Sequence, residues 1–417
     1  MESRPESKSP EDPAVWSAAT RVVFRFCFLY FPLFFLTMIP NPPLARLICW
    51  VGVHLFRASS SMYPGGSDTI FDYLRTLLCV VLAALGTLVW SALARRGGYA
   101  GLHRWFRTAV RLLLVFAMNM YGWDKIFLLQ MPEPGPDTLV SQFGRMTPFQ
   151  LLWSFMGYSR TYQISSGIAE VLAGALLLIP RFTLAGAVLC FGVMTHVFVI
   201  NMSYDVPVKI LSFHLLLLAV FLIAPDADRL ADLFFRNRPA APSRSFAPSS
   251  RPWARRLTAG LFAVVVLLAL YLNFQIRGIR THSLQAAREL PFYGAWSVEE
   301  FAEDGGAPHF EGNGRWLQLV LVHRDEAQIR LFDGTYDHVS LTFDGNARKF
   351  ALSDDANAQI TTLPRVWKSE FAFEMPDAQT LVVSGVVEGT RVRATCRRID
   401  VSKLPLATAR FRWTSGE

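Results

Sequence analysis

The residues of this chain that could do chemistry are ionisable side chains that lie inside long apolar runs or directly at their ends. On insertion scales, a charged side chain at the centre of a membrane helix costs about 2.5–3.5 kcal/mol, so such a residue indicates a function. The set consists of Asp124, Lys125, Glu170, His196, Asp205, Lys209 and His214. The five cysteines form no Cys-x-x-Cys pair and the histidines no His-x-x-x-His pair, so we expect neither a disulfide nor a metal site.

Glu170 is the strongest candidate, because it lies near the middle of its apolar run. Gln163, Gly167 and Gly174 fall on the same face of a helix at this position. Small residues beside a carboxylate are typical of a helix-packing face, so the Glu170 side chain should point into a bundle. The alternative is a protonated glutamic acid that only forms a structural hydrogen bond to a neighbouring helix.

Asp124 and Lys125 end another apolar run, with Tyr121 about one turn before them. We assign Tyr121 and Asp124 to ligand binding and Lys125 to catalysis; the alternative is an interfacial anchor. His196 lies in a separate apolar run and is a further catalytic candidate. A histidine on an apolar face is, however, more often a core residue than a ligand.

Asn201, Asp205 and Lys209 crowd one short loop between two apolar runs. We predict that Asn201 binds a ligand and that Asp205 and Lys209 are catalytic. The alternative for Asp205 is that it caps the next helix, because Pro207 follows and proline is tolerated in a first helical turn. These groups, with His214, should line a polar pocket whose floor is Glu170.

The elements that must position these residues are membrane helices. Hydrophobic residues make up 52% of the chain and charged residues only 18%, which is less charge than in a typical soluble domain. A spanning helix needs about 20 apolar residues. Seven runs qualify: residues 22–39, 76–94, 106–127, 162–179, 182–200, 208–224 and 258–276. The alternative is six spans plus a re-entrant segment.

The distribution of arginine predicts the orientation. Arginines cluster before the first run, between the second and third, and in the linker before the last, as the positive-inside rule requires for a cytoplasmic N-terminus. This pattern explains the net charge of +8 without nucleic-acid binding. Arg25 and Arg111 lie one turn inside their runs, where they can extend to the membrane interface. Residues 44–56 are amphipathic and predict an interfacial helix.

From about Pro291 the pattern changes to short alternating stretches separated by turn residues. The alternating residues are Leu317, Leu319 and Leu321; Val339, Leu341 and Phe343; Phe371 and Phe373; and Val392, Ala394 and Cys396. Such strands predict an antiparallel barrel. The fold class is therefore a multi-pass α-helical membrane bundle with a C-terminal antiparallel β-barrel. Its predicted parts are a polar tail (1–21), a bundle (22–224), a cytoplasmic linker (225–257), a last membrane helix (258–280) and the β-domain (285–417).

The segment from about 107 to 226 resembles the DoxX family of four-helix membrane proteins. The resemblance lies in Tyr121-x-x-x-Lys125, in Glu170-x-x-x-Gly174, and in the stretch from His196 to Lys209. Gly294-Ala295-Trp296, with Arg410 and Arg412, is similar to lipocalin-like barrels, in which a late arginine lies across the tryptophan ring. That similarity predicts one of these arginines within about 6 Å of the Trp296 ring. The alternative is a tryptophan that merely plugs the barrel.

The DoxX resemblance implies a fold and a quinone or isoprenoid lipid as cofactor, more than a particular reaction. On this basis we expect a quinone- or lipid-linked oxidoreductase subunit in a bacterial inner membrane, with its β-domain in the periplasm. In that role Glu170 is the proton acceptor and Lys125 or Lys209 the electrostatic partner of an anionic group. Two alternatives are a small-molecule carrier and an assembly subunit that recruits a protein partner through its β-domain.

Overall fold

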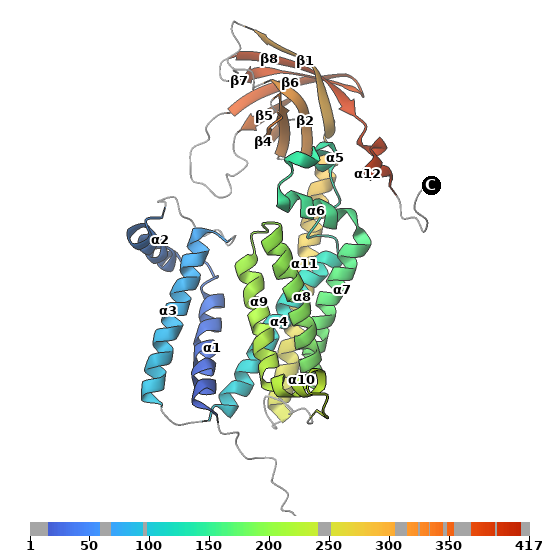
Figure 1. The fold of residues 1–417 in the computed structure, drawn as a ribbon. Coiled ribbons are helices and arrows are strands. Elements are labelled where there is room, and N and C mark those ends of the chain that lie inside the picture. Colours follow the sequence, from blue (N-terminus) through green and yellow to red (C-terminus); the bar gives the residue numbers. More distant parts are fainter. Residues whose placement is uncertain are drawn as a thin grey trace, which may run out of the picture. The chain divides into compact units, whose positions relative to one another are not determined.

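The computed structural model combines helices that can cross a membrane with a β-barrel (Figure 1). It describes residues 16–58, 68–94, 98–240, 252–304, 315–323, 326–332, 334–344, 348–353, 368–387 and 390–409. The chain forms two compact units. The helical unit comprises Met1–Trp123 and Ser166–Tyr271, and the barrel unit comprises Asp124–Ser165 and Leu272–Glu417. A segment from the middle of the chain therefore packs with the C-terminal domain.

The long helices coincide with the predicted apolar runs. They are α1 (Ala18–Leu36), α3 (Ile70–Leu93), α4 (Ala100–Ile126), α7 (Arg160–Leu178), α8 (Thr183–Ser203), α9 (Lys209–Ile223) and α11 (Pro252–Arg288). Shorter helices are α2 (Pro42–Phe56), α5 (Pro136–Val140), α6 (Pro148–Tyr158), α10 (Ala227–Phe234) and α12 (Pro405–Thr408). Within the described residues, six helical stretches, built around α1, α3, α7, α8, α9 and α11, are long and apolar enough to span a membrane.

Helix α4 is the predicted span that is not among these six. It has 27 residues, enough to cross a bilayer, but it is less apolar than the others because Arg104, Arg107, Arg111, Asp124 and Lys125 lie in it. Both Arg107 and Arg111 are buried inside the protein. The low hydropathy of α4 therefore reflects in part side chains that are buried inside the protein, whereas Arg104 is exposed.

Buried arginines bind the carbonyl ends of three helices. Arg25 donates to the Ala94 carbonyl at the end of α3, and Arg111 donates to the Leu177 carbonyl near the end of α7 at 2.6 Å. Arg107 donates to the Leu222 carbonyl near the end of α9 at 3.0 Å. The last carbonyls of a helix lack intrahelical partners, and a cation also offsets the negative end of the helix dipole.

Arg25 and Arg111, which the sequence places where they can extend to the membrane interface, contact protein groups. Their side chains are almost fully buried, with 3% and 1% of their surface exposed. Arg25 also lies over the Tyr99 ring at 5.3 Å, and Arg111 over the Phe262 ring at 5.0 Å. The aromatic faces and carbonyl oxygens take the place of water around each guanidinium.

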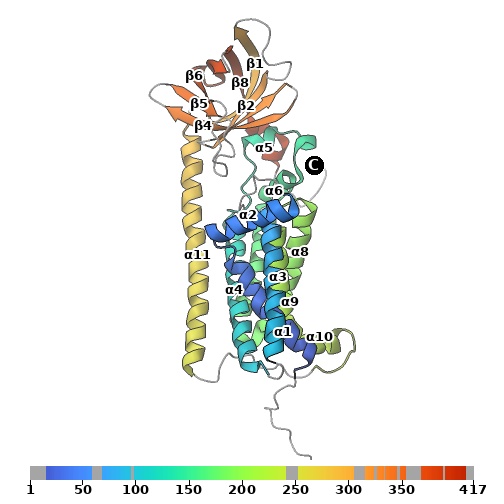
Figure 2. The same cartoon turned by 90° about the vertical axis from the view of Figure 1, so that its left-hand side faces the viewer.

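Helix α11 is the longest helix, with 37 residues (Figure 2). At 1.5 Å per residue its length is about 55 Å, which exceeds the roughly 30 Å of a hydrocarbon core. Its C-terminal part carries Arg277, Arg280 and Arg288, belongs to the barrel unit, and leads directly into the first strand. Arg277 lies over the Phe127 ring at 5.5 Å in the same unit.

The C-terminal domain is a closed, eight-stranded antiparallel barrel in which each strand pairs with its sequence neighbours. The strands are β1 (Gly294–Asp304), β2 (Trp316–His323), β3 (Glu326–Leu331), β4 (Tyr336–Asp344), β5 (Lys349–Ser353), β6 (Lys368–Asp377), β7 (Thr380–Val387) and β8 (Thr390–Ile399). Strand β1 pairs with β8 and closes the barrel. The predicted fold class, a helical membrane bundle with a β-barrel, is confirmed.

The barrel interior is a packed hydrophobic core. The inward residues include the predicted alternating sets, such as Leu319 and Leu321, Phe371 and Phe373, and Val392, Ala394 and Cys396. Phe292, which precedes β1, is fully buried against Phe343, Phe350 and Phe373. Eight strands leave an interior that side chains can fill. Burial raises the pKa of the Cys396 thiol to about 12.

Trp296 lies in β1 and is fully buried in the barrel. Its indole N–H donates to the Phe292 carbonyl at 2.8 Å. The guanidinium of Arg398, from the last strand, lies over the indole at 4.8 Å. The predicted Arg410 and Arg412 lie outside the described residues. An arginine thus lies across the indole, but it is Arg398 of β8, and the predicted contact with Arg410 or Arg412 stays a prediction.

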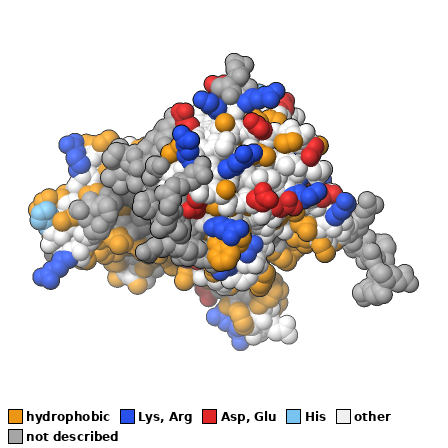
Figure 3. All heavy atoms as spheres, turned by 90° about the horizontal axis from the view of Figure 1, so that it is seen from above, with side chains coloured by type: hydrophobic (Ala, Val, Ile, Leu, Met, Phe, Trp, Pro, Cys, Tyr) orange, Lys and Arg blue, Asp and Glu red, His pale blue; other side chains and the backbone are white. Residues whose placement is uncertain are grey.

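The outer face of the barrel carries charges of both signs (Figure 3). Arg397 and Glu299, on the paired strands β8 and β1, lie 3.6 Å apart. In the turn between β6 and β7, the Asp377 carboxylate accepts hydrogen bonds from the Gln379 N–H at 2.7 Å and the Thr380 hydroxyl at 3.0 Å. These bonds lower the pKa of Asp377 below its usual value. Mixed surface charge is typical of a domain that faces water.

Replacing Phe292 by alanine should destabilise the barrel, because the change leaves a cavity among three phenylalanine rings. We expect a loss of about 3–5 kcal/mol in the free energy of unfolding. Denaturant unfolding of the full chain in detergent, followed by tryptophan fluorescence, measures it. Phe332→Ala is the matched control, because Phe332 is 59% exposed. Equal effects of the two substitutions would contradict the packed-core assignment.

Candidate functional site

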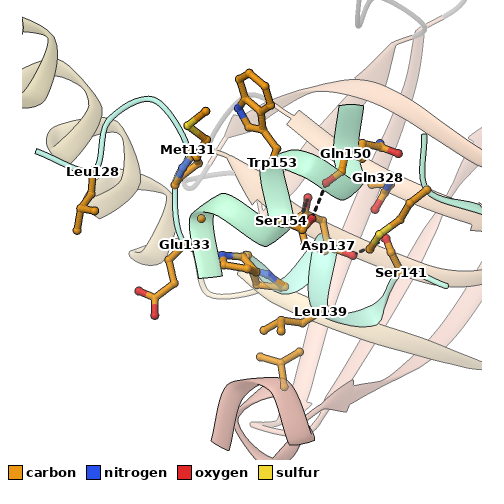
Figure 4. Close-up of a pocket in the computed structure, with 18 of the residues that line it drawn as sticks. Leu128, Met131, Glu133, Asp137, Leu139, Ser141, Gln150, Trp153, Ser154 and Gln328 are labelled. Carbon is orange, nitrogen blue, oxygen red and sulfur yellow. Dashed lines mark hydrogen bonds between the residues drawn. The ribbon is translucent and has the colours of Figure 1, made fainter. Parts of the chain in front are cut away.

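The barrel unit contains a cavity of about 700 Å³ between the segment 124–165 and the outer wall of the barrel (Figure 4). This volume lies within the usual range for small-molecule sites. Residues of α5, α6 and their connecting turns form most of the wall. Gln328 of β3 and Tyr293, just before β1, contribute from the barrel side, and Arg288 contributes from the end of α11.

Local sequence signals shape the α5–α6 side of this cavity. The run from Met131 to Pro136 is rich in proline and leads into α5. Helix α6 begins with a capping box, in which the Thr147 hydroxyl accepts from the Gln150 N–H at 3.2 Å and the Gln150 side chain accepts from the Thr147 N–H at 2.9 Å. A Cβ atom at Gly157 would overlap the carbonyl oxygen of Pro132, so only glycine allows this close approach.

Gln163, fully buried in the first half of α7, fixes the turn that follows α4. With its amide oriented to satisfy both groups, it donates to the Met131 carbonyl at 2.9 Å and accepts from the Met131 N–H at 3.2 Å. These two bonds satisfy the backbone N–H and carbonyl of Met131, which lies in a turn without a helical or strand partner. Gln163 therefore holds the wall of the cavity in place.

The cavity wall is amphipathic. Phe149 and Trp153 stack with their ring centroids 4.1 Å apart, and Met131 and Leu139 add further apolar surface. The polar part includes an exposed ion pair between Arg160 and Glu133, with a nitrogen–oxygen distance of 2.7 Å. Arg288 and Asp137 add one more cation and one more anion, so these four side chains sum to no net charge. A wall of this kind suits a ligand with a flat apolar part and a polar end.

Glu170 lies elsewhere, in the helical unit, with only 2% of its surface exposed. Small residues bring α7 close to α4 on either side of it. A Cβ atom at Gly122 would lie 2.7 Å from Val171 Cγ2, and one at Gly174 would lie 2.8 Å from Asn119 Nδ2. The Glu170 carboxyl is also close enough to act electrostatically on Cys190 of α8. Its side chain is thus surrounded by protein.

The α8–α9 connection brings together Asn201, Asp205 and Lys209. Asn201 is buried and donates to the Ser212 hydroxyl at 3.1 Å. The Lys209 ammonium pairs with the exposed Asp205 carboxylate at 2.6 Å. The proposed capping role of Asp205 is wrong, because Asp68 caps α9 instead. The Asp68 carboxylate accepts from the N–H groups of Lys209 at 2.6 Å and Ile210 at 3.1 Å.

The remaining predicted residues do not gather at one point. His196 is exposed on the surface of α8. Tyr121 is partly buried and packs against the core of the helical unit. Asp124 and Lys125 belong to the barrel unit, where Lys125 is buried. Among the described residues, no group of three His, Cys, Asp or Glu side chains could hold a metal ion. The catalytic and ligand-binding roles of the predicted residues stay predictions.

Sequence reasoning missed the groups that surround His214. Tyr30 of α1 shares a hydrogen bond with His214, and Asp72 and Arg75 of α3 lie 3.5 Å apart nearby in the same interface. A signal was present for Asp72, because Thr69 and Asp72 form a capping box at the start of α3. Two charges in the first turns of an otherwise apolar helix should have been counted with the other intramembrane groups. Tyr30 carries no such signal in the sequence.

The fold and these sites define a class: a multi-pass helical membrane protein with a closed antiparallel β-barrel and buried ionisable groups between its helices. The chain is 32% identical over 133 residues to the uncharacterized protein YwoB of Bacillus subtilis. The match covers 30% of this chain and 79% of YwoB, so the chain belongs to the same family as YwoB. No known family model matches the chain. No solved structure matches it either.

Replacing Gly122 by valine should separate α4 from α7, because the new side chain would meet Val171 and the Gly167 carbonyl oxygen. We expect a loss of about 1–3 kcal/mol in stability. The thermal midpoint of the purified full chain in detergent measures it. Gly192→Val on α8 is the control, since no described atom lies within 4 Å of a Cβ atom there. A normal midpoint for Gly122→Val would show that the two helices are not held by this contact.

Proposed function

We propose that this protein is a DoxX-like membrane protein that binds a quinone or another amphipathic lipid in the cavity of its barrel unit. In this proposal it works as a subunit of a lipid-linked oxidoreductase. The ligand's flat apolar part contacts the Phe149–Trp153 pair, and its polar end faces Arg288 and Asp137. The observation that supports the proposal is the cavity of about 700 Å³ with a wall that combines aromatic and charged groups.

The residues of the cavity fit the head group of a quinone in three respects. Trp153 offers an aromatic face for stacking, Arg288 and Tyr293 carry donors for carbonyl oxygens, and Met131 and Leu139 exclude water. A bound quinone would supply two-electron chemistry that protein side chains do not provide. The chain's own contribution is to bind and orient the ring. Glu170 as proton acceptor and Lys125 or Lys209 as electrostatic partner remain part of the proposal.

The proposal also assigns a location. The chain lies in a bacterial inner membrane with its N-terminus in the cytoplasm and its barrel in the periplasm. The arginine distribution supports this orientation through the positive-inside rule. The cavity then lies on the periplasmic side. The exposed apolar residues of α2, including Trp50 and Phe56, suit a helix that rests in the membrane interface.

Trp153→Ala should reduce the amount of quinone or lipid that co-purifies with the protein. Truncating an aromatic anchor costs about 1–2 kcal/mol, so retention should fall about tenfold. Mass spectrometry of lipid extracts from protein purified in mild detergent measures the retention. Phe155→Ala is the matched control, because Phe155 lies on the same helix, is 57% exposed and is absent from the cavity wall. If both variants retain as much ligand as the wild type, the cavity is not the binding site.

Reporter fusions test the orientation separately from the ligand. A fusion after Ala240 should report the cytoplasm and a fusion after Ser283, in the last turns of α11, the periplasm, because the apolar part of α11 (residues 258–276) lies between these positions. An alkaline phosphatase reporter, active only outside the cytoplasm, distinguishes the two sides. A fluorescent protein that matures only in the cytoplasm serves as the complementary control. Identical readings at both positions would mean that α11 does not cross the membrane.

A further inference from the structure

The helical unit contains a buried tyrosine–histidine pair whose hydrogen bonds have a defined direction. The Nε2 atom of His214 lies 2.6 Å from the Tyr30 hydroxyl, and its Nδ1 atom lies 2.6 Å from the Ile210 carbonyl oxygen. A carbonyl oxygen can only accept, so Nδ1 carries the hydrogen. In the neutral imidazole, Nε2 then has no hydrogen and accepts from the Tyr30 hydroxyl. The contacts therefore select one tautomer.

The groups that face this pair come from α1, α3 and α9. The imidazole of His214 stacks on the Phe34 ring at 3.5 Å with an interplanar angle of 4°. The Arg75 guanidinium lies over the same phenylalanine ring at 5.5 Å and is 3.5 Å from the Asp72 carboxylate. On α3, the thiol of Cys79 is 3.4 Å from the Thr37 hydroxyl. The titratable and charged neighbours are thus Asp72, Arg75 and Cys79.

A purely structural role does not require this set of residues. His214 is 3% exposed, Tyr30 6%, Asp72 3% and Arg75 5%. Breaking up a buried charged pair is costly, but well-packed apolar residues can replace such a pair at little cost to stability. Ionisable residues inside membrane proteins commonly mark proton pathways. The interface between α1, α3 and α9 therefore contains more ionisable side chains than the packing of these helices requires.

The pair also lies close to the ends of its helices. Helix α3 begins at Ile70 and α9 at Lys209, and their start points are linked because Asp68 caps α9. At 1.5 Å per residue, Arg75 and His214 each lie about 8 Å along their helices from these starts. In the predicted topology these helix starts lie at the outer membrane surface, so a proton from that side has only a short distance to travel.

We propose that Tyr30 and His214 form a proton-exchange site within the helical unit. A proton that arrives at the Tyr30 oxygen is matched by transfer of the phenolic hydrogen to His214 Nε2. A hydronium ion supplies the arriving proton and leaves as water; a new O–H bond forms on Tyr30 while its original O–H bond breaks and an N–H bond forms at Nε2, so Tyr30 stays neutral. The product is an imidazolium that donates from both nitrogens, to the Ile210 carbonyl and to the Tyr30 oxygen.

The surroundings of the pair disfavour the imidazolium form of His214, so the proton stays there only briefly. In the imidazolium form, Nε2 of His214 donates to the Tyr30 oxygen, so the hydrogen bond between α1 and α9 is reversed. The hydroxyl hydrogen of Tyr30 then no longer has Nε2 as its acceptor. Arg75 opposes the new positive charge, whereas Asp72 partly offsets it. The proton therefore binds and leaves reversibly. This inference stands apart from the lipid cavity, because it rests on residues of the helical unit alone.

Nuclear magnetic resonance of the full chain with ¹⁵N-labelled histidine tests the proposal in detergent. The His214 signals are those lost in His214→Gln. At neutral pH they should show the tautomer with hydrogen on Nδ1, and as the pH falls from about 8 toward about 4 the imidazolium signals should grow. Tyr30→Phe should lower the midpoint by about one pH unit, because the bond that the charged imidazolium donates to the Tyr30 oxygen is stronger than the bond that the neutral ring accepts.

His196→Gln is the matched control, because His196 is exposed on α8 and should leave the His214 titration unchanged. The proposal is overturned if His214 stays neutral throughout the range in which the protein remains folded. It is also overturned if the hydrogen resides on Nε2, or if Tyr30→Phe leaves the midpoint unchanged. Should Tyr30→Phe fail to fold, the wild-type titration alone decides between a proton-exchange site and a fixed structural contact.

Discussion

The interaction on which the bundle depends is the binding of helix carbonyl ends by buried arginines. A membrane core offers no water, so each free backbone group must find a partner inside the protein. Arg25, Arg107 and Arg111 supply that partner for α3, α9 and α7. Each arginine comes from a different helix than the one it binds, so the same bonds that satisfy the backbone also fix which helices are neighbours. Carbonyl dipoles offset the charge of all three guanidiniums, and aromatic faces add to this at Arg25 and Arg111.

Helix α4 joins this network to the rest of the helical unit. Two of the arginines lie in its first half, and Asn119 and Gly122 lie further along, where α7 approaches closely. The Asn119 amide donates to the Val115 carbonyl at 2.8 Å and accepts from the Trp123 indole at 3.1 Å, so its polar groups are satisfied along α4 itself. A helix that contacts several others in this way can be less apolar than a lipid-facing helix, because little of its polar surface meets lipid.

The sequence predicted the elements well and the site poorly. Apolar runs and alternating strands are local patterns, and they led to the helices, the closed barrel and the inward face of residues such as Leu319 and Phe371. The partners of Asp68, Tyr30 and Arg398 could not be predicted, because each contact joins segments far apart in the chain. Periodicity also could not place His196, since a uniformly apolar helix such as α8 gives no sign of which face meets the protein.

The closure of the barrel by β1 and β8 restricts how this domain can recruit another protein. Many partners are captured by strand addition, in which an extended peptide pairs with the free edge of a sheet. A closed barrel has no such edge, so a partner would have to recognise side chains on its outer wall, where Arg397 and Glu299 lie. Specificity would then come from the pattern of surface charge, and binding would weaken as ionic strength rises. Closure also leaves the domain without an edge on which copies in a crowded membrane could stack into intermolecular sheets.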